Sequence, residues 1–357
     1  MLLKALPATA ELQARLSQPF VEGSFATAQG AVPRISTRLT LKDRLGALRV
    51  RLSIGRSSYR ILPGLYAAGS PSRSSPVFVT ANYKLSFDAL KQALAGIHSW
   101  ILVIDTRGVN VWCAAGKGSF GNEELARRIA STRLALHVDH RELILPQLAG
   151  PGVSAPRFAK DHGWRLRFGP VRAADIPAYL AAGLAKTEEM RRVRFSARDR
   201  LVLAPLELVA GLKKLAPCLL LFLTAAFLAA PKDPGAALAR SAWAFLPFAL
   251  AYAATTLLFP LLLPALPGRA FSLKGAILGL TLASLAILAS KAPPLLALSY
   301  LLAMPALSGW FGLLFTGSTT YTSLSGVELE VRAARLPLLI AGAAGLGLRL
   351  ALLAGRI

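Results

Sequence analysis

The chain is poor in cysteine. It has only two in 357 residues, Cys113 and Cys218, which excludes a disulfide framework and any Cys-rich metal motif. An iron–sulfur cluster generally needs about four thiolates. Any iron–sulfur chemistry must therefore come from a partner protein.

The start of the chain lacks the continuous apolar stretch of a signal peptide. Lys4, Glu11 and Arg15 interrupt the first 18 residues. We therefore expect no secretory leader, and we expect the soluble part of the protein to stay in the cytoplasm.

Acidic residues are also scarce. The chain has 18 Asp and Glu against 41 Lys and Arg, a net charge of +23, yet 54% of its residues are hydrophobic. Residues 1–211 hold 30 of the basic and 15 of the acidic residues, and the remainder has long apolar runs. This division predicts a basic soluble domain followed by a membrane domain.

The excess of basic residues does not by itself indicate a nucleic-acid-binding protein. The basic residues are scattered, and the sequence has no zinc finger or RNA-binding aromatic motif. An anionic membrane surface or an acidic protein partner accounts for the charge more simply.

Alternating strands and helices follow a poorly readable beginning. Residues 39–52 alternate weakly, as in a strand or hairpin, and residues 64–75 are rich in Gly, Ser and Pro, as in a loop. Strands are then expected at 77–81, 100–105, 134–138, 143–145 and 164–168, and helices at 86–97, 122–133 and 173–183. This order predicts an α/β fold with a doubly wound, mainly parallel sheet.

The second half of the chain predicts about five membrane spans, each near the 20 residues that a hydrocarbon core needs. They lie at about 212–230, 239–262, 271–290, 293–315 and 336–354. The basic residues that flank the spans are slightly more frequent on the side of the soluble domain, which predicts that this domain lies in the cytoplasm. The polar loop at 316–323 would then face the cytoplasm, either as a functional segment or as a solvated connection.

The run Asn110-Val-Trp-Cys-Ala-Ala-Gly-Lys117 contains the most informative residue, Cys113. Asn110 is a good helix N-cap, so a short helix should begin at Val111, at the carboxyl end of a buried strand. We expect Ala114 and Ala115 to leave room beside the thiol for a broad, flat ligand, and Trp112 to pack the helix onto the sheet. A thiol on a rigid element beside a crevice is a candidate metal ligand or nucleophile.

Of three other interpretations of this segment, two remain open. Residues 116–121 match G-x-G-x-x-G, but about ten residues separate the strand from Gly116, and only Asp139 could bind a ribose. A P-loop fails because Lys117 is followed by Gly118 and its first glycine is replaced by Val111. A buried, inert cysteine is the third alternative.

The run Asn110–Lys117 resembles the cap-helix signature of the corrinoid protein of microbial mercury methylation (the HgcA family). It is also similar to the corrinoid subunit of the acetyl-CoA pathway's iron–sulfur protein. The resemblance to the mercury family covers about residues 60–335, with Ser119 and Asn122 where many relatives have threonine. Further resembling segments are 77–88, 118–124, 145–152, 169–177, 189–195 and 316–328.

The resemblance implies a Rossmann-like doubly wound cobalamin-binding domain at 61–186. An N-terminal extension at 1–60 precedes it. A basic connector at 187–211 and an all-α transmembrane domain of about five helices at 212–357 follow.

The resemblance also implies a function: membrane-anchored transfer of a methyl group from a corrinoid cobalt to Hg(II), giving methylmercury. Cys113 would be the lower axial cobalt ligand of a base-off corrinoid. Its thiolate, a soft and strong donor, would favour release of the methyl group as a carbanion equivalent. Other expected cofactor contacts are Asn110, Val111, Trp112, Ala114, Ala115, Gly116, Lys117, Gly118, Thr80, Asn82, Tyr83, Lys84, Ser86, Pro146, Gln147, Leu148, Gly152 and Val153.

The expected partners are a methyltetrahydrofolate-linked methyl donor, membrane lipid and a ferredoxin-like two-cluster protein that donates electrons. His137, His140 and His162 are weaker candidates for cobalt ligands or acid–base groups. The rival hypotheses are a corrinoid protein with another methyl acceptor, a non-catalytic corrinoid or dinucleotide-binding membrane protein, and a transporter. The transporter is disfavoured because Arg349 alone lies well inside a predicted span.

Overall fold

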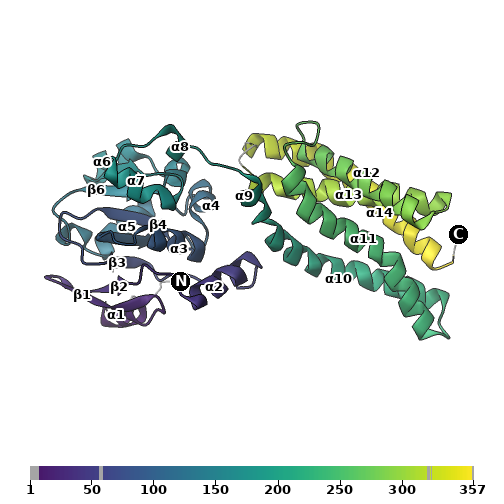
Figure 1. Cartoon of the computed structure of the whole chain (residues 1–357), viewed down its shortest axis with the longest axis horizontal. Helices are drawn as coiled ribbons and strands as arrows, with labels where there is room; N and C mark the ends of the chain where they lie inside the picture. The colour runs from purple at the N-terminus through teal and green to yellow at the C-terminus, as the bar shows by residue number, and fades with distance from the viewer. Residues whose placement is uncertain (1–7, 56–58, 320–321, 323, 356–357) are drawn as a thin grey trace. The chain divides into compact units, whose positions relative to one another are not determined.

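The chain folds into two units, Met1–Val193 and Arg194–Ile357 (Figure 1). The structure, a computed structural model, describes residues 8–55, 59–319, 322 and 324–355. The division between the units lies within residues 187–211, the segment expected to be a basic connector.

The first unit is built on a mixed seven-stranded sheet with the order β1-β2-β3-β5-β4-β6-β7. β5, β4, β6 and β7 are parallel neighbours, whereas β3 pairs antiparallel with β5, and β1 with β2. The carboxyl ends of the four parallel strands therefore meet at one edge. The strands are β1 Val21–Thr27, β2 Gly30–Ile35, β3 Gly64–Ala68, β4 Val77–Ala81, β5 Ser99–Ile104, β6 Glu142–Leu145 and β7 Arg165–Phe168.

Helices cover both faces of this sheet. All residues of β3, β4 and β5 are buried, because alternate side chains of each strand enter two separate apolar cores. α4, α5 and α6 contribute to one core, and α3 and α7 to the other. The helices of this unit are α1 Ala8–Leu16, α2 Leu41–Arg51, α3 Lys84–Ala93, α4 Val111–Gly116, α5 Asn122–Ser131, α6 Ala155–His162, α7 Ile176–Ala181 and α8 Glu188–Arg191.

Three local predictions are wrong. Residues 39–52 form the helix α2, which a Thr40–Asp43 capping box begins, instead of a strand or hairpin. Gly64–Ala68, expected as loop, is the buried strand β3, which pairs with β2 and β5 and whose side chains enter the two apolar cores. Leu134–Leu136 is a 3₁₀ helix instead of a strand.

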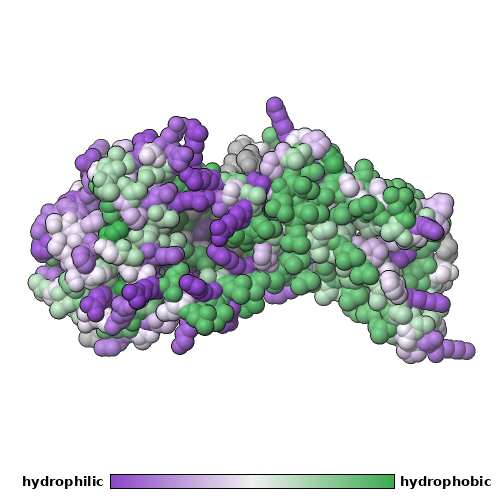
Figure 2. Space-filling view, viewed as in Figure 1, coloured by the Kyte–Doolittle hydropathy of each residue, from purple (hydrophilic) through white to green (hydrophobic). Residues whose placement is uncertain are grey.

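The regular elements in the described part of the second unit are all helices. Among these residues, four helices are long and apolar enough to cross a membrane, and the run Ala197–Lys213 with Leu215–Ala229, bent by 41°, makes a fifth if it is one span. Figure 2 shows apolar side chains over much of these helices. The helices are α9 Ala197–Leu201, α10 Ala204–Ala229, α11 Pro234–Leu262, α12 Phe271–Ser290, α13 Pro294–Phe315 and α14 Leu324–Leu353.

Small residues bring α12 and α13 into close contact. A Cβ on Gly275 would lie 2.2 Å from the Ser308 carbonyl oxygen, and one on Gly279 would lie 2.5 Å from that of Met304. Glycines four residues apart on one helix face are typical of helix packing in membranes, where apolar burial between helices gives little stabilisation.

The polar loop expected at 316–323 is described in part. Thr316–Ser318 forms a 3₁₀ turn, and the Thr322 hydroxyl donates to the Thr316 carbonyl over 2.9 Å. Residues 320, 321 and 323 lie outside the described residues.

Candidate functional site

The short helix α4 begins as the sequence predicts. The Asn110 side-chain oxygen accepts a hydrogen bond from the Cys113 backbone N–H over 2.9 Å, which caps the first turn. The helix has only six residues. Because so short a helix is marginal by itself, its cap and its packing must hold it in place.

The two faces of α4 are the reverse of the expectation for Trp112, Ala114 and Ala115. Trp112 is 37% exposed, whereas Ala114 and Ala115 are 0% and 4% exposed and pack in the core. The helical turn explains this, because Cys113 shares its exposed face with Gly116, three residues along. A Cβ on Gly116 would meet nothing within 4 Å, so Gly116 is the small residue that leaves space beside the thiol.

The buried face of α4 rests on the 3₁₀ helix at Gln147–Gly152. A Cβ on Gly152 would lie 2.8 Å from the Ala115 Cα and 2.2 Å from the Phe120 carbonyl oxygen. Only a glycine fits this contact without displacing backbone. Gly152 therefore acts on α4 by close packing from beneath.

An apolar cavity of about 370 Å³ lies next to α4, at the carboxyl ends of β4, β6 and β7. α3 follows β4 on one face of the sheet, and α6 follows β6 on the other. In doubly wound sheets such a switch point is where ligands bind. The walls are formed by Phe78, Val79, Thr80, Tyr83, Leu85, Ser86, Ala89, Leu90, Asn110, Val111, Trp112, Ile144, Leu145, Pro146, Leu148, Gly169, Pro170, Val171, Ala173 and Ile176.

Eight residues that the sequence singled out line this cavity. They are Thr80, Tyr83, Ser86, Asn110, Val111, Trp112, Pro146 and Leu148. Cys113 does not line it, because the thiol is exposed on the outer face of α4. The exposed thiol of Cys113 is thus next in the chain to Trp112, which lines the apolar cavity.

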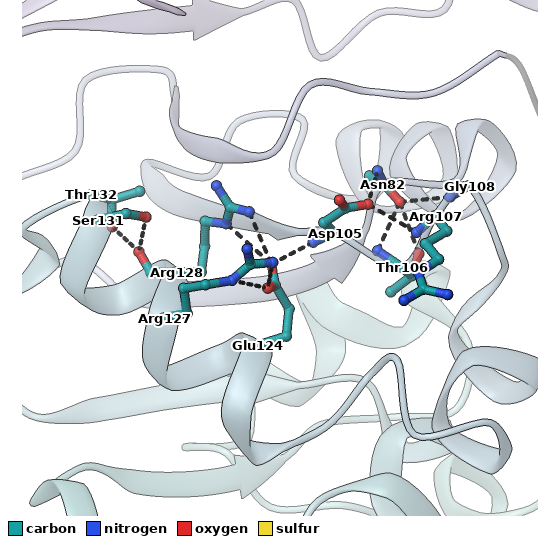
Figure 3. Close-up of polar contacts among 10 residues, drawn as sticks. All are labelled: Asn82, Asp105, Thr106, Arg107, Gly108, Glu124, Arg127, Arg128, Ser131 and Thr132. Carbon is teal, nitrogen blue, oxygen red and sulfur yellow. Dashed lines mark hydrogen bonds and ion pairs between the residues drawn. The ribbon is translucent and has the colours of Figure 1, made fainter. Parts of the chain in front are cut away.

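Asn82 organises the loop that leads to α4 (Figure 3). Its side-chain oxygen accepts from the Thr106 N–H, the Thr106 hydroxyl and the Gly108 N–H at 2.9–3.0 Å. Its amide donates to the Asp105 carboxylate over 2.9 Å. Asn82 is only 2% exposed and does not line the cavity, so its contacts position the turn before Asn110.

A second carboxylate supports the same loop from α5. Glu124 accepts from the Asp105 backbone N–H over 2.8 Å, and Arg127 and Arg128 pair with it. Figure 3 shows the Glu124 side chain between these groups. Together, Glu124 and Asn82 hold both sides of the turn between β5 and α4.

Lys84 lies away from the cavity, in a buried ionic cluster. Its Nζ donates to Asp43 over 3.0 Å and also pairs with Asp88, and Lys91 donates to Asp43 over 3.0 Å. Burial alone would raise the pKa of Asp43, but hydrogen bonds from the Thr40 backbone, Lys91 and Lys84 hold it well below its usual range. Within the structure, Lys84 joins α2 to α3.

The other expected contacts are spread around α4. Lys117 is exposed, Gly118 has φ +76°, and Val153 is 6% exposed within the core. Gln147 accepts a hydrogen bond from Lys186, whose pKa burial lowers, with Arg191 adding to the effect. Lys186 also approaches the carbonyl oxygen of Gly169 in the cavity wall, over 3.4 Å.

Sequence reasoning missed the far wall of the cavity. Gly169, Pro170 and Val171 follow β7, and Leu85 and Ala89 lie one turn apart on α3. The position of Gly169 after a parallel strand was the available signal. The wall that Leu85 and Ala89 form depends on the packing of α3 against the sheet, which their spacing alone does not show.

The histidines have structural contacts. Burial lowers the pKa of His137, with Arg73 adding to the effect, and its ring lies 5.5 Å from that of Trp100. His140 Nε2 is 3.0 Å from the Ser75 carbonyl oxygen, and the His162 ring lies 4.7 Å from that of Phe158. In the described parts of the chain, no three His, Cys, Asp or Glu side chains are grouped as a metal site.

Fold and site together define a two-part protein. A mixed α/β unit carries a ligand-sized crevice and an exposed thiol, and a helical unit carries four or five helices of membrane length. Within the first unit, residues 54–180 match the family model of the CO dehydrogenase/acetyl-CoA synthase delta subunit.

Curated relatives match a stretch of similar length. Acetyl-CoA decarbonylase/synthase complex subunit gamma of Methanopyrus kandleri is 33% identical over 138 residues, which are 38% of this chain and 29% of that protein. The subunit gamma of Archaeoglobus fulgidus is 31% identical over 35% of this chain and 27% of its own length. The corrinoid/iron-sulfur protein large subunit of Moorella thermoacetica is 29% identical over 35% of this chain and 28% of its own length.

The chain thus spans less than a third of the length of each of these relatives. The chain is related to subunits of acetyl-CoA decarbonylase/synthase complexes and of a corrinoid/iron-sulfur protein, and the family-model match lies in its α/β unit. The matched model ends at residue 180, before the helical unit begins at Arg194.

Proposed function

We propose that this protein is a membrane-anchored corrinoid methyltransferase that transfers a methyl group from cobalt to Hg(II), giving methylmercury. The observation that carries the proposal is the exposed Cys113 on a capped helix beside the crevice, and the similarity of the chain to a corrinoid/iron-sulfur protein subunit supports it. When bound, the corrinoid supplies a cobalt-held methyl group that an electrophilic Hg(II) ion accepts as a carbanion equivalent.

The residues present fit a base-off corrinoid with thiolate ligation. The thiol of Cys113 reaches the surface, and Gly116 leaves open space next to it. A cavity of about 370 Å³ is smaller than a whole corrinoid, so most of the cofactor would lie over the exposed face of α4. Trp112, which is exposed and lines the cavity, would contact the ring, and Asn110 would hold the thiol in position.

A thiolate below the cobalt suits Hg(II) as the acceptor. Cys113 would supply the cobalt with a soft, strongly donating thiolate, and such donation would favour transfer of the methyl group with its bonding electron pair. A corrinoid that gave up its methyl group in this way would need two electrons from an outside donor before it could take a methyl cation from methyltetrahydrofolate.

The chain has too few cysteines for an iron–sulfur cluster, so the electron donor in this proposal is a separate ferredoxin-like protein with two clusters. The net charge of +23 favours an acidic partner. The four or five apolar helices would anchor the protein in the cell membrane, with the α/β unit in the cytoplasm.

The decisive test compares Cys113→Ala with Cys218→Ala in the purified full-length protein. Cys218 lies on α10 and serves as a matched control, since it loses the same atoms in the other unit. With cobalamin bound, Cys113→Ala should change the optical spectrum and lower methylmercury formation at least 100-fold, whereas Cys218→Ala should leave both unchanged. An unchanged spectrum and activity in Cys113→Ala would refute the proposed ligation.

The second candidate is a corrinoid protein with a different methyl acceptor. Relatedness to acetyl-CoA decarbonylase/synthase subunits favours it. In that case the cobalt spectrum would still depend on Cys113, but the methylated, reduced protein would form no methylmercury from Hg(II).

A further inference from the structure

The helical unit contains a large cavity of its own, of about 860 Å³, between α11, α12, α13 and α14. Its walls are mostly apolar, and its polar residues gather at one end. Arg240 and Trp243 lie within three turns of the start of α11, Tyr300 within two turns of the start of α13, and Arg349 close to the end of α14. The polar end of the cavity therefore lies where helices begin and end, at the level of a membrane interface.

Arg349 is the unusual residue of this cavity. Its Nε is buried and has no hydrogen-bond partner in the structure, and its guanidinium lies 5.9 Å from the centre of the Tyr300 ring. A buried guanidinium nitrogen without an acceptor is costly, especially in an apolar bundle. A ligand that brings an anionic oxygen into the cavity would satisfy it.

A second arginine lines the same end of the cavity. Arg240 is exposed, so its guanidinium can reach an anion at the surface while Arg349 meets it from within. Trp243, 74% exposed, lies one turn further along α11. An exposed tryptophan next to basic residues is typical of the headgroup level of a membrane protein.

The rest of the cavity is an apolar groove along α11. It extends along α11 from Arg240 to Ala254, fourteen residue steps, or about 21 Å at about 1.5 Å per residue. The groove is therefore long enough for an acyl chain that crosses one leaflet, because the hydrocarbon of one leaflet is about 15 Å deep, half of about 30 Å. Leu250 and Leu285, both exposed, line this groove and give it the surface that an acyl chain contacts.

We propose that this cavity binds an anionic phospholipid, with the headgroup phosphate between Arg240 and Arg349 and one acyl chain in the groove. The two arginines complement the phosphate, and the length of the groove selects a lipid over a small soluble anion. The site is independent of the corrinoid chemistry proposed for the other unit.

The test uses full-length protein in nanodiscs of phosphatidylcholine, with or without phosphatidylglycerol. Native mass spectrometry after release into detergent should find about one phosphatidylglycerol retained by the wild type, and at least tenfold less by Arg349→Gln. Arg335→Gln is the matched control, because Arg335 is exposed on the same helix and does not line the cavity. It should retain the lipid as the wild type does.

Leu250→Trp fills the groove and keeps both arginines, and it should also lose the lipid if the chain binds there. Equal retention by the wild type, Arg349→Gln and Leu250→Trp would overturn the proposal. Displacement of phosphatidylglycerol by millimolar inorganic phosphate would overturn the claim that the site selects a lipid over a small soluble anion. If Arg349→Gln fails to fold, the Leu250→Trp variant decides the question. Loss of phosphatidylglycerol from this variant supports the proposal, and retention as in the wild type overturns it.

Discussion

The Asn110 side-chain oxygen and the Cys113 backbone N–H lie 2.9 Å apart, and this one hydrogen bond begins the helix that exposes the thiol. The residue that starts the helix and the residue proposed to bind cobalt are therefore directly linked. Because a six-residue helix has few hydrogen bonds of its own, a substitution of Asn110 should make the position of Cys113 less well fixed.

Asn110→Ala should release the first turn of α4. Loss of an N-cap costs about 1 kcal/mol, and here the cost falls on one short helix. Amide hydrogen exchange at residues 111–116 should become about fivefold faster, and the affinity for cobalamin should fall. Asn110→Ser, which can cap, is the control, and equal exchange in both variants would contradict a capping role.

Gly152→Ala should displace α4 from beneath. Its Cβ would lie 2.2 Å from the Phe120 carbonyl oxygen and 2.8 Å from the Ala115 Cα, so backbone must move. Overpacking of this kind costs about 1–3 kcal/mol. Thermal unfolding should shift by several degrees, whereas Gly150→Ala, where a Cβ meets nothing within 4 Å, should change little.

Asn82→Ala should loosen the turn before α4 although it does not touch the cavity. The variant leaves the backbone N–H groups of Thr106 and Gly108 without their acceptor, at a cost of about 1–3 kcal/mol. Limited proteolysis should then cut within residues 105–110. The control is Asn122→Ala. Asn122 accepts an exposed hydrogen bond from the Ser154 backbone N–H over 3.1 Å, and its loss should leave the turn before α4 protected.

Asp43→Asn should destabilise the first unit by about 3–5 kcal/mol, because it leaves the Lys84 and Lys91 ammonium groups underpaired in a buried cluster. The control, Asp161→Asn, removes an exposed partner of Arg157 and should cost less than about 1 kcal/mol.

The effect of Asp43 should also depend on pH. Its pKa in the folded protein is held below the ordinary 3.8, so the stabilisation is fully present above about pH 4 and is lost as the pH falls further. Urea unfolding of the wild type and Asp43→Asn between pH 3 and 7 should show a difference that shrinks only at the acid end. A constant difference throughout would contradict this account.

The sequence by itself determined the local features that depend on near neighbours. The N-cap at Asn110, the strands at Val77–Ala81 and Ser99–Ile104, and the long apolar helices follow from residue type and spacing within one element. Cys113 was singled out by the same local pattern.

Only the tertiary structure decided which side of α4 faces the solvent. A helix of six residues is too short for its apolar pattern to define a face, so packing on Gly152 sets its orientation and leaves Gly116, not Ala114, beside the thiol. Likewise, Lys84 and Asn82 directly follow the strand β4, a position that made them candidate cofactor contacts. Contacts with Asp43, more than 40 residues away, and with Thr106 instead make them supports of the fold.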